Sequence, residues 1–494
     1  METIEDRRST RSFSTAHGAE RDLPTPSTEN FPHTANAPGQ SVPKRTNSDG
    51  DRQDSDPEKN AVHNQSGGDS PRQLYGFWAP EIANERKAYL IGIARLTALI
   101  TILIWGVLAI YWGSLWKATE KTGELDAWII NRDTTGGIVG NTTISVLLDS
   151  KTNNEAMHLN WRVVSPADYP TSADVQHAVA VDEKAWIAVE VMQDVSNRLI
   201  SARANGDASW SPQGQVMMYI SEARANTVVP GYVLSPTQRR LQMAYASMAN
   251  QLAGQYYTQI AGNATALSAL ARAPQTVSTP IIPTPDNLRP YNQPVATAPT
   301  FVGLIYVVII ALNVTLGNFG MRQPIQHKLK ISSLIAMRFA IPIIVYLILS
   351  FNYSMLNLPF KLNFNGWGLG YGAGFMTFVA ATWCGMIVLG LIIECAVSIV
   401  GPNFIGFFLI LLIIANVSVV VFPIPLQPHF YRYGYALPFP HLKSIYTCLI
   451  FNTGRHILLL YHFGVLWGWM IVIALTFPIW IILERKRATP GSKK

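Results

Sequence analysis

Six apolar stretches punctuate the chain, and polar connections of very different length separate them. The first stands alone, and the other five follow one another closely toward the C-terminus. They cover 91–116, 301–319, 332–351, 371–395, 402–422 and 463–483. A helix needs about 20 apolar residues to cross the ~30 Å hydrocarbon layer of a bilayer. The pattern therefore predicts a multi-pass α-helical membrane protein with six transmembrane helices in a 1+5 arrangement.

A polar stretch of different character, 117–300, lies between the first two spans. Short apolar runs alternate along it with segments of helical period, which predicts a small α/β domain around a mainly parallel sheet. Strands are expected at 125–133, 159–166, 184–192 and 215–223, and helices at 136–151, 172–183, 195–206 and 237–262. A Pro-rich linker closes the domain and leads back into the membrane.

The two ends of the chain are polar. Residues 1–84 are rich in Ser, Thr, Pro, Asn, Asp and Gly and hold few large apolar side chains, so burial cannot offset the entropy cost of folding. We therefore expect a disordered tail there. It has neither the basic start nor the apolar core of a cleavable signal, so the first span is expected to serve as a signal anchor. The last residues, 484–494, are predicted to form a basic tail.

The charge distribution sets the predicted orientation. Charged residues make up 14% of the chain, against about 25% in soluble domains. The net charge is +7, but residues 301–494 alone contain 13 basic residues and two acidic ones. Most of these basic residues fall in the predicted inner loops and the C-terminal tail, as the positive-inside rule requires. Both termini are therefore predicted to be cytosolic and the α/β domain extracytoplasmic, in the plasma membrane or an endomembrane. A nucleic-acid partner gains no support.

One acid, Glu394, lies inside the fourth span, close to its predicted inner end. Burying a bare charge in a membrane costs ~2.5 kcal/mol or more, so an intramembrane acid is a functional candidate by default. A place near the interface also suits a structural acid that pairs with a neighbouring helix. Two interpretations stay open: a structural acid, interfacial or helix-paired, and an acid that takes part in substrate or proton handling.

The connection between the fifth and sixth spans, 423–462, is predicted to be an aromatic outer loop. Prolines and aromatic residues are dense in its first half. One interpretation is an amphipathic surface segment whose aromatic rings lie at the level of the lipid headgroups. The other is a re-entrant lid along a pathway, in which Arg432 attracts anionic headgroups or substrate. Glu394 and Arg432 are therefore the candidate pathway residues.

Glycosylation sequons occur at Asn141 and Asn263, both in the predicted outer domain, so both are candidate glycosylation sites. The matches at Asn313 and Asn416 fall inside predicted spans and are expected to be silent. Scattered acids of the outer domain, Asp133 among them, are expected to serve as turn residues and helix caps.

Familiar catalytic motifs are absent from the sequence. It contains no GxxxxGK[ST], HExxH, CxxC or GxSxG pattern, and its three cysteines lie in or beside apolar runs. We therefore expect no enzyme activity, no catalytic residues, no cofactor and no metal site.

Several short segments carry a family resemblance. They are "IYWGSLW" (110–116), "AWIINRD" (127–133), "KAWIAV" (184–189), "NVSVVVFPIPLQPHFYRYGYALP" (416–438) and "FGVLWGW" (463–469). With them, over about 85–485, the chain resembles the fungal nitrosoguanidine-resistance membrane proteins. The 1+5 arrangement around an outer domain is also similar to the membrane components of bacterial ABC-type exporters.

This resemblance implies a function but supplies no binding residues. It implies resistance to toxic small molecules, either by permease-like export or by a changed distribution of lipids between the leaflets. The alternative is a non-transporting membrane scaffold or regulator of membrane composition. Membrane lipids and small toxic molecules are the expected partners, and an oligomer and a separate ATPase partner both stay open.

Overall fold

The computed structural model describes residues 74–368 and 370–488. Most of the predicted disordered tail and the end of the basic tail, 1–73 and 489–494, lie outside the described residues. From Phe77 onward the chain forms one compact unit. A short turn, η1 (Pro80–Ile82), already precedes the first helix, so helical structure starts before the predicted tail boundary at residue 84. The Arg86 guanidinium stabilises this turn by donating to the carbonyl of Phe77 at 3.0 Å.

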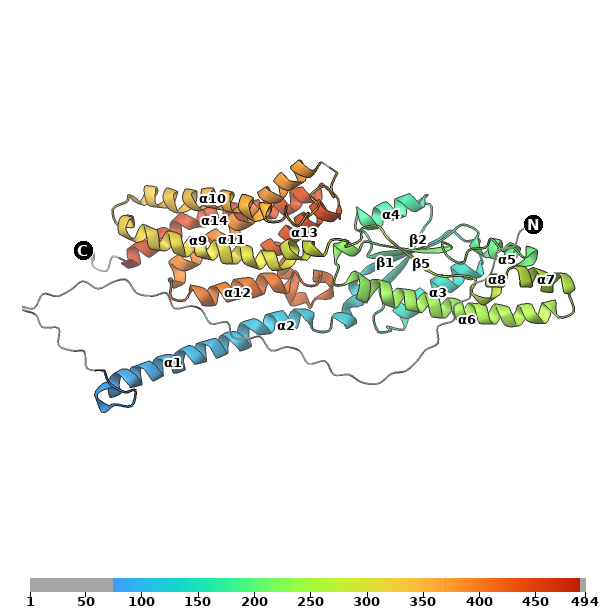
Figure 1. Ribbon diagram of the computed structural model, residues 1–494, viewed down its shortest axis with the longest axis horizontal. Coiled ribbons are helices and arrows are strands. Elements are labelled where there is room, and N and C mark those ends of the chain that lie inside the picture. The colour runs from blue at the N-terminus through green and yellow to red at the C-terminus, as the bar shows by residue number, and fades with distance from the viewer. Residues whose placement is uncertain (1–73, 369, 489–494) are drawn as a thin grey trace, which may run out of the picture. The chain divides into compact units, whose positions relative to one another are not determined.

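Five helical runs are long and apolar enough to cross a membrane, counted over the described residues. Figure 1 shows α9, α10, α11 and α14 running side by side. The runs contain α1 (Ala83–Leu103) with η2 (Ile104–Leu108) and α2 (Ala109–Leu115), α9 (Gly303–Gln326), α10 (Ile331–Met355), α11 (Tyr371–Val400) and α14 (Leu458–Ala488). The multi-pass helical architecture predicted from the sequence is therefore confirmed.

The predicted fifth span, 402–422, contains a shorter helix. It is α12 (Ile405–Ser418), of 14 residues. At 1.5 Å per residue such a helix is about 21 Å long, less than the ~30 Å of a hydrocarbon layer. The count of six crossings, and with it the cytosolic position of both termini, stays a prediction.

The helix α11 forms the centre of the helical part. Helices α9, α10, α13 (Pro438–Phe451) and α14 pack around it, and every residue from 384 to 391 is buried. Gly390 makes this close packing possible, because a side chain there would collide with the ring of Tyr346 on α10. Gly374 likewise faces the backbone of Phe364, whereas Gly370 has open space around it.

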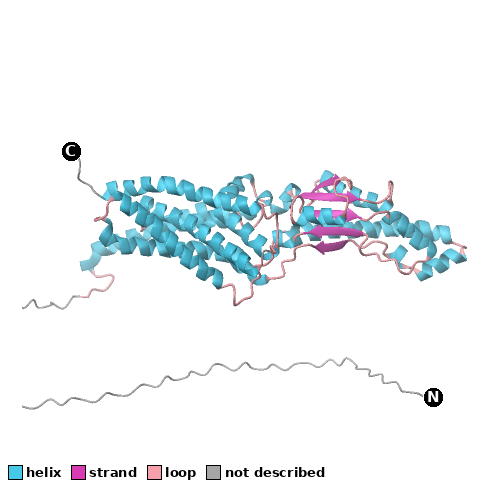
Figure 2. Cartoon of the chain, turned by 90° about the horizontal axis from the view of Figure 1, so that it is seen from above, coloured by secondary structure: helices cyan, strands magenta, loops and turns pink. Residues whose placement is uncertain are grey.

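The α/β domain contains a five-stranded sheet in the order β2-β1-β3-β4-β5 (Figure 2). All neighbouring pairs are parallel except β3 with β4. The strands are β1 (Asp126–Asn131), β2 (Asn160–Val164), β3 (Ile187–Val191), β4 (Val216–Ile220) and β5 (Thr284–Asn287). The first four lie where the sequence predicts strands. The fifth lies inside the Pro-rich stretch predicted as a linker, which is therefore part of the sheet.

Helices cover both faces of this sheet. They are α3 (Ile138–Thr152), α4 (Ser172–Ala180), α5 (Val195–Asn205), α6 (Ser235–Ile260), α7 (Ala264–Arg272) and α8 (Gln275–Ser278). Alternate residues of β1 face opposite sides, as the two-residue period of a strand requires. Ala127 and Ile129 belong to the core shared with α3, α5 and α6, and Trp128 and Ile130 belong to the core shared with α4.

The carboxylate of Asp133, just after β1, joins the starts of two helices. Its oxygens accept from the backbone N–H of Gly140 on α3 at 3.2 Å and from that of Ser196 on α5 at 2.9 Å. The Ser196 hydroxyl donates to it as well, at 2.5 Å. Unpaired N–H groups and the helix dipole at each N-terminus favour an anion at this point. Asp133 therefore acts as a structural cap, in agreement with the sequence-based expectation for the scattered acids.

The predicted aromatic outer loop, 423–462, contains three helical pieces: η8 (Ile424–Leu426), η9 (His429–Ala436) and α13 (Pro438–Phe451). Phe430 and Tyr435 on η9 are exposed, which suits a surface segment. In contrast, 11 of the 14 residues of α13 are buried, and α13 packs on α11 and α14. The interpretation of the whole connection as a surface segment is therefore wrong for α13, because its aromatic and aliphatic side chains fill the core of the bundle.

Glycosylation tests the predicted orientation of the α/β domain. Asn141 is exposed on α3, and the exposed Asn263 caps α7 through its side-chain oxygen, which glycosylation of the amide nitrogen leaves in place. In cells, we expect Asn141→Gln and Thr265→Ala each to remove one endoglycosidase-sensitive gel shift. Thr265→Ala deletes the second sequon but keeps the cap.

Asn313→Gln, within α9, serves as the control and should leave the gel pattern unchanged. The orientation would be contradicted by full-length protein that shows no endoglycosidase-sensitive form and whose α/β domain is digested by protease added to intact microsomes. That result would place the domain on the cytosolic side.

Candidate functional site

Glu394 lies on α11, one to two turns before the helix ends at Val400. Its side chain is buried. The helix thus continues past the predicted span end at Cys395. The same end of the bundle carries the connection between α9 and α10 and the basic end of α14, which are cytosolic in the predicted orientation.

Two arginines from neighbouring helices surround the Glu394 carboxylate. Arg322 on α9 donates to its Oε1 atom through Nη1. Arg338 on α10 reaches the same oxygen through Nη2 at 2.7 Å and through Nε at 2.8 Å. Both guanidinium groups are 1% exposed. The three helices α9, α10 and α11 therefore meet at one carboxylate.

Arg338 extends this network to a fourth helix. Its Nη1 atom lies 2.6 Å from Oε2 of Glu484 on α14, and its Nη2 atom donates to the Ser398 hydroxyl at 2.7 Å. We call Arg322, Arg338, Glu394 and Glu484 the charge cluster. It contains two positive and two negative groups, so its formal charges cancel. Such cancellation is what permits ionic groups to be buried at all.

Some polar atoms of the cluster stay without a protein partner. They are Nε and Nη2 of Arg322 and Oε2 of Glu394. The Arg322 guanidinium lies 5.0 Å from the ring of Phe319, which supplies an aromatic face but no acceptor. Buried polar atoms of this kind normally bond to water or another ligand. These three atoms are therefore available to bond a water molecule, and the free oxygen of Glu394 could also accept a proton.

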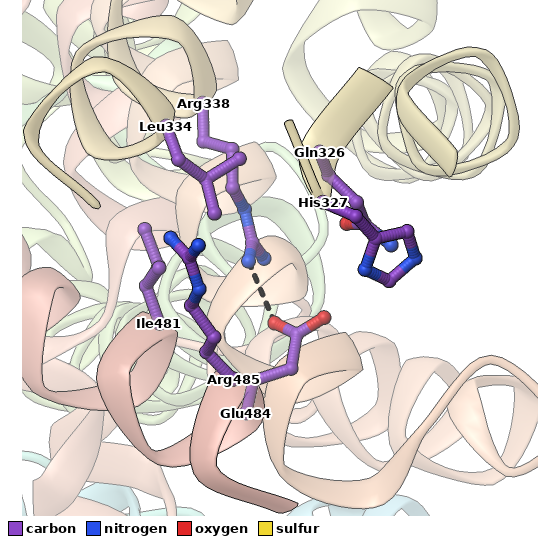
Figure 3. A pocket seen from close by; sticks show the side chains of 7 residues that line it. All are labelled: Gln326, His327, Leu334, Arg338, Ile481, Glu484 and Arg485. Carbon is purple, nitrogen blue, oxygen red and sulfur yellow. Dashed lines mark hydrogen bonds and ion pairs between the residues drawn. The ribbon is translucent and has the colours of Figure 1, made fainter. Parts of the chain in front are cut away.

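A small cavity of about 40 Å³ adjoins the cluster. Figure 3 shows Arg338 and Glu484 facing each other along this space, with Arg485 and Ile481 nearby on the same helix as Glu484. The cavity is large enough for a water molecule, which needs about 10–15 Å³ by this kind of measure. It is too small for an organic substrate.

The structure thus gives Glu394 the helix-paired surroundings of the first sequence interpretation. In the sequence, Arg322 and Arg338 are only two of the 13 basic residues of 301–494, and nothing local pairs them with Glu394. A signal was present, because Arg322, Arg338 and Glu394 all lie near the predicted inner ends of their spans. A role of Glu394 in substrate or proton handling stays a prediction.

Arg432, the second candidate pathway residue, lies elsewhere. It is exposed on η9, and η9 contacts α2, at the end of the first long helical run, through the Tyr431 hydroxyl, which donates to the carbonyl of Ile110 at 2.5 Å. Arg432 lines a cavity of about 210 Å³ together with Lys121 and Glu124 of η3 (Ala118–Glu124). The structure therefore does not bring Glu394 and Arg432 together.

A further cavity, between the α/β domain and the helices, adjoins that of Arg432. It measures about 400 Å³, within the ~300–1,000 Å³ typical of small-molecule sites. We call it the Lys443 cavity. Its wall on the domain side contains Glu183, Trp186 and Arg224. The wall on the helical side combines the apolar segment 419–425 with polar residues of α13 and α14: His441, Lys443, Ser444, Thr447, Tyr461 and His462.

Direct bonds hold the α/β domain on this end of the helices. Arg455, after α13, donates to Asp182 at 2.6 Å, and this hydrogen bond holds the pKa of the Asp182 carboxyl below its ordinary value. The Arg289 guanidinium donates to the carbonyl of Asn452 at 2.8 Å. An edge-to-face contact between the rings of Tyr232 and Phe422, with centroids 5.5 Å apart, adds an apolar contact. The Lys443 cavity is therefore bounded by a fixed contact between the two parts.

A family of proteins of unknown function, DUF3533, matches residues 96–475. The chain belongs to this family. The match includes three of the five long apolar helical runs completely and parts of the other two, together with the α/β domain and the whole of the Lys443 cavity lining. The family description assigns no function.

The DUF3533 chain is also similar to a protein of Saccharomyces cerevisiae. This relative is described as an uncharacterized endoplasmic reticulum membrane protein. It is 22% identical over 436 residues, which cover 82% of each chain. No solved structure matches the chain.

The charge cluster makes a prediction for stability. Glu394→Gln removes the carboxylate that faces two buried arginines, so we expect it to lower the free energy of unfolding by about 3 kcal/mol or more. Glu484→Gln makes the same chemical change at a side chain that is 25% exposed and has one arginine partner, so its cost should be about 1 kcal/mol or less. Thermal unfolding of the purified protein in detergent measures both.

A charge-balanced variant serves as the control. Arg322→Met combined with Glu394→Gln leaves Arg338 with Glu484 and removes one charge of each sign. It should unfold at a higher temperature than Glu394→Gln alone. If Glu394→Gln and Glu484→Gln were equally stable, the cluster would not be held together by the pairing described above.

Proposed function

We propose that this DUF3533 protein is a permease-like membrane protein that moves amphipathic toxic molecules or lipids across the bilayer and so confers resistance to toxic small molecules. The Lys443 cavity carries this proposal. It has the volume of a ligand site and combines an apolar wall with polar groups, which is the surface an amphipathic molecule requires. The resemblance to nitrosoguanidine-resistance proteins supports toxic small molecules or lipids as what is moved.

The charge cluster has a complementary role in this proposal. Because it joins α9, α10, α11 and α14 at the end remote from the α/β domain, it holds that end closed around a space for water only. Movement of a substrate through the bundle would require these pairs to separate. We propose that Glu394 acts as a latch between helices, and that the substrate contacts the other end first.

A non-transporting scaffold remains the second candidate function, and the tight packing of α11 favours it. Every residue of α11 from 384 to 391 is buried, so this part of the central helix lines no open path among the described residues. In this case the protein would alter membrane composition through partners. The endoplasmic reticulum description of the yeast relative favours an endomembrane for either function.

A cavity-filling substitution separates the two functions. Ser444 lines the Lys443 cavity, and its hydroxyl bonds only within its own helix, to the carbonyl of Pro440 at 2.9 Å. In cells that lack the gene, we expect Ser444→Trp to lose tolerance to nitrosoguanidine and to accumulate more of it, at normal protein level. Ser444→Ala, which leaves the cavity open, should keep both properties of the wild type.

Purified protein in liposomes provides the direct measurement. Movement of a labelled lipid or of nitrosoguanidine under an ion gradient, lost in Ser444→Trp, supports transport. No movement under any gradient, together with full tolerance in Ser444→Trp cells, would rule out the permease and favour the scaffold. Tolerance that is unchanged by Glu394→Gln and by Arg432→Gln at normal protein levels would point the same way.

A further inference from the structure

The lysine of the Lys443 cavity is a cation without a carboxylate partner among the described residues. Its ammonium group donates one hydrogen bond, to the carbonyl of Val420 at 2.8 Å. An ammonium group has three donors, so two are available to a ligand. The side chain lies between packed elements and keeps part of its surface open toward the cavity, whose wall it lines.

The other charges of the cavity neutralise one another. Arg224, at the end of η4 (Glu222–Arg224), lies 3.3 Å from Glu183 through Nε. Its guanidinium carbon lies 3.8 Å from the ring centroid of Trp186, and its Nη1 atom donates to the carbonyl of Ala185 at 3.1 Å. This arginine is thus fixed by an acid, a ring and a backbone oxygen. Lys443 supplies the uncompensated charge.

Two histidines on the same wall form a neutral pair. Their Nδ1 atoms lie 2.9 Å apart, and Nε2 of His441 lies 2.9 Å from the carbonyl of Tyr435. A carbonyl accepts only, so Nε2 of His441 carries the proton and its Nδ1 atom accepts from Nδ1–H of His462. The Nε2 atom of His462 is left as a further polar group. The pair contributes hydrogen bonding without adding negative charge.

The segment opposite Lys443 is apolar. Residues 419–425 contribute Val419, Val420, Phe422, Pro423, Ile424 and Pro425 to the lining. A ligand that satisfies the whole surface needs a negative group for Lys443 and an apolar part for this wall. A free small anion would leave the wall unused, and a neutral amphiphile would leave the ammonium without an acceptor.

We propose that the Lys443 cavity binds an anionic amphiphile, with its negative group at Lys443 and its apolar part along 419–425. This inference rests on the proposed function and names its substrate class. Two sources share the chemistry: a free amphipathic anion, and a membrane lipid with an anionic headgroup.

Photo-crosslinking of the full-length protein in a non-ionic detergent tests the proposal. The two probes are a diazirine-bearing palmitate and the matching palmityl alcohol, which differ only in the carboxylate. A charge-assisted hydrogen bond favours the acid by about tenfold, so we expect about ten times more labelling of 419–425 by the acid, read by peptide mass spectrometry. Equal labelling by the two probes would overturn the proposal.

Variants locate the charge. We expect Lys443→Gln to reduce acid labelling to the level of the alcohol, and Lys361→Gln, at an exposed lysine of the connection after α10, to change nothing. Ser444→Asp places a negative charge beside the cavity without altering Lys443, and Ser444→Asn is its isosteric control. Acid labelling should fall in Ser444→Asp alone. Should both Ser444 variants label like the wild type, an anion at this place would be excluded.

The pH dependence provides an independent arm. Burial lowers the pKa of Lys443 to about 8, so the ammonium loses its proton as the pH rises through that value, while the probe carboxylate stays ionised. Acid labelling should therefore fall between about pH 7 and about pH 9.5, and alcohol labelling should not. Titratable or charged groups from the surrounding elements that face the same space are Glu183, Arg224, Tyr435, His441, Tyr461 and His462. Labelling by the acid that is constant over this range would contradict the role of Lys443.

Competition identifies the source of the ligand and separates this inference from the proposed function. Dodecyl phosphate should displace the acid probe, whereas displacement by inorganic phosphate at the same concentration would overturn the amphiphile class. Displacement of the acid probe by phosphatidylserine in nanodiscs supports a lipid source. If dodecyl phosphate displaces the probe and phosphatidylserine does not, a free amphiphile is supported. Anion-selective labelling without transport in liposomes would contradict the permease function and support the anion site. Transport in liposomes without anion-selective labelling would support the permease function and contradict the anion site.

Discussion

The buried ion pairs around Glu394 constrain the helical part more tightly than any apolar contact does. Lipid tails are as apolar as the helices that they surround, so packing and polar contacts must decide how the helices associate. One carboxylate oxygen receives donors from α9 and α10, and Arg338 carries the network to α14. A shift of any of these helices by one residue would rotate its side chains by about 100° and leave a buried charge alone. The cluster therefore fixes the register of four helices.

The two ends of the bundle differ in how they fill space. At the end with the charge cluster, the neighbouring cavity holds little more than a water molecule. At the end with the α/β domain, α13 fills the centre, while the segment before it leaves a cavity of ligand size. Buried charge is thus placed where the protein is closed, and an unpaired cation where it is open. In the proposed function, this asymmetry relates the architecture to the binding of a membrane-derived molecule at the open end.

The sequence predicted the features that depend on local periodicity. Long apolar runs located the spans, and alternation with helical segments located four strands, because both patterns are properties of consecutive residues. Contacts across the chain were not accessible in this way. Arg322 and Arg338 are 72 and 56 residues from Glu394, and no local pattern links them. For β5, Pro285 concealed the strand, since proline fits only an edge position, which is where β5 lies.

The composition of the connection after α12 was also ambiguous for a physical reason. Aromatic and proline residues suit both a headgroup layer and a packed core, and only the fold separates exposed η9 from buried α13. The length of α12 could not be predicted from the sequence either, because the apolar run continues beyond Ser418, whereas the helix ends at that residue.

Because it contains β5, the Pro-rich stretch that the sequence predicted as a linker connects the sheet directly to the helical part. Its residues pair with β4, and the chain then passes through Arg289, tied to the end of α13, before it enters α9. Only residues 288–293 lie between β5 and the helical run that contains α9. A tilt of the sheet would therefore be transmitted to α9, the helix that carries Arg322 at its far end.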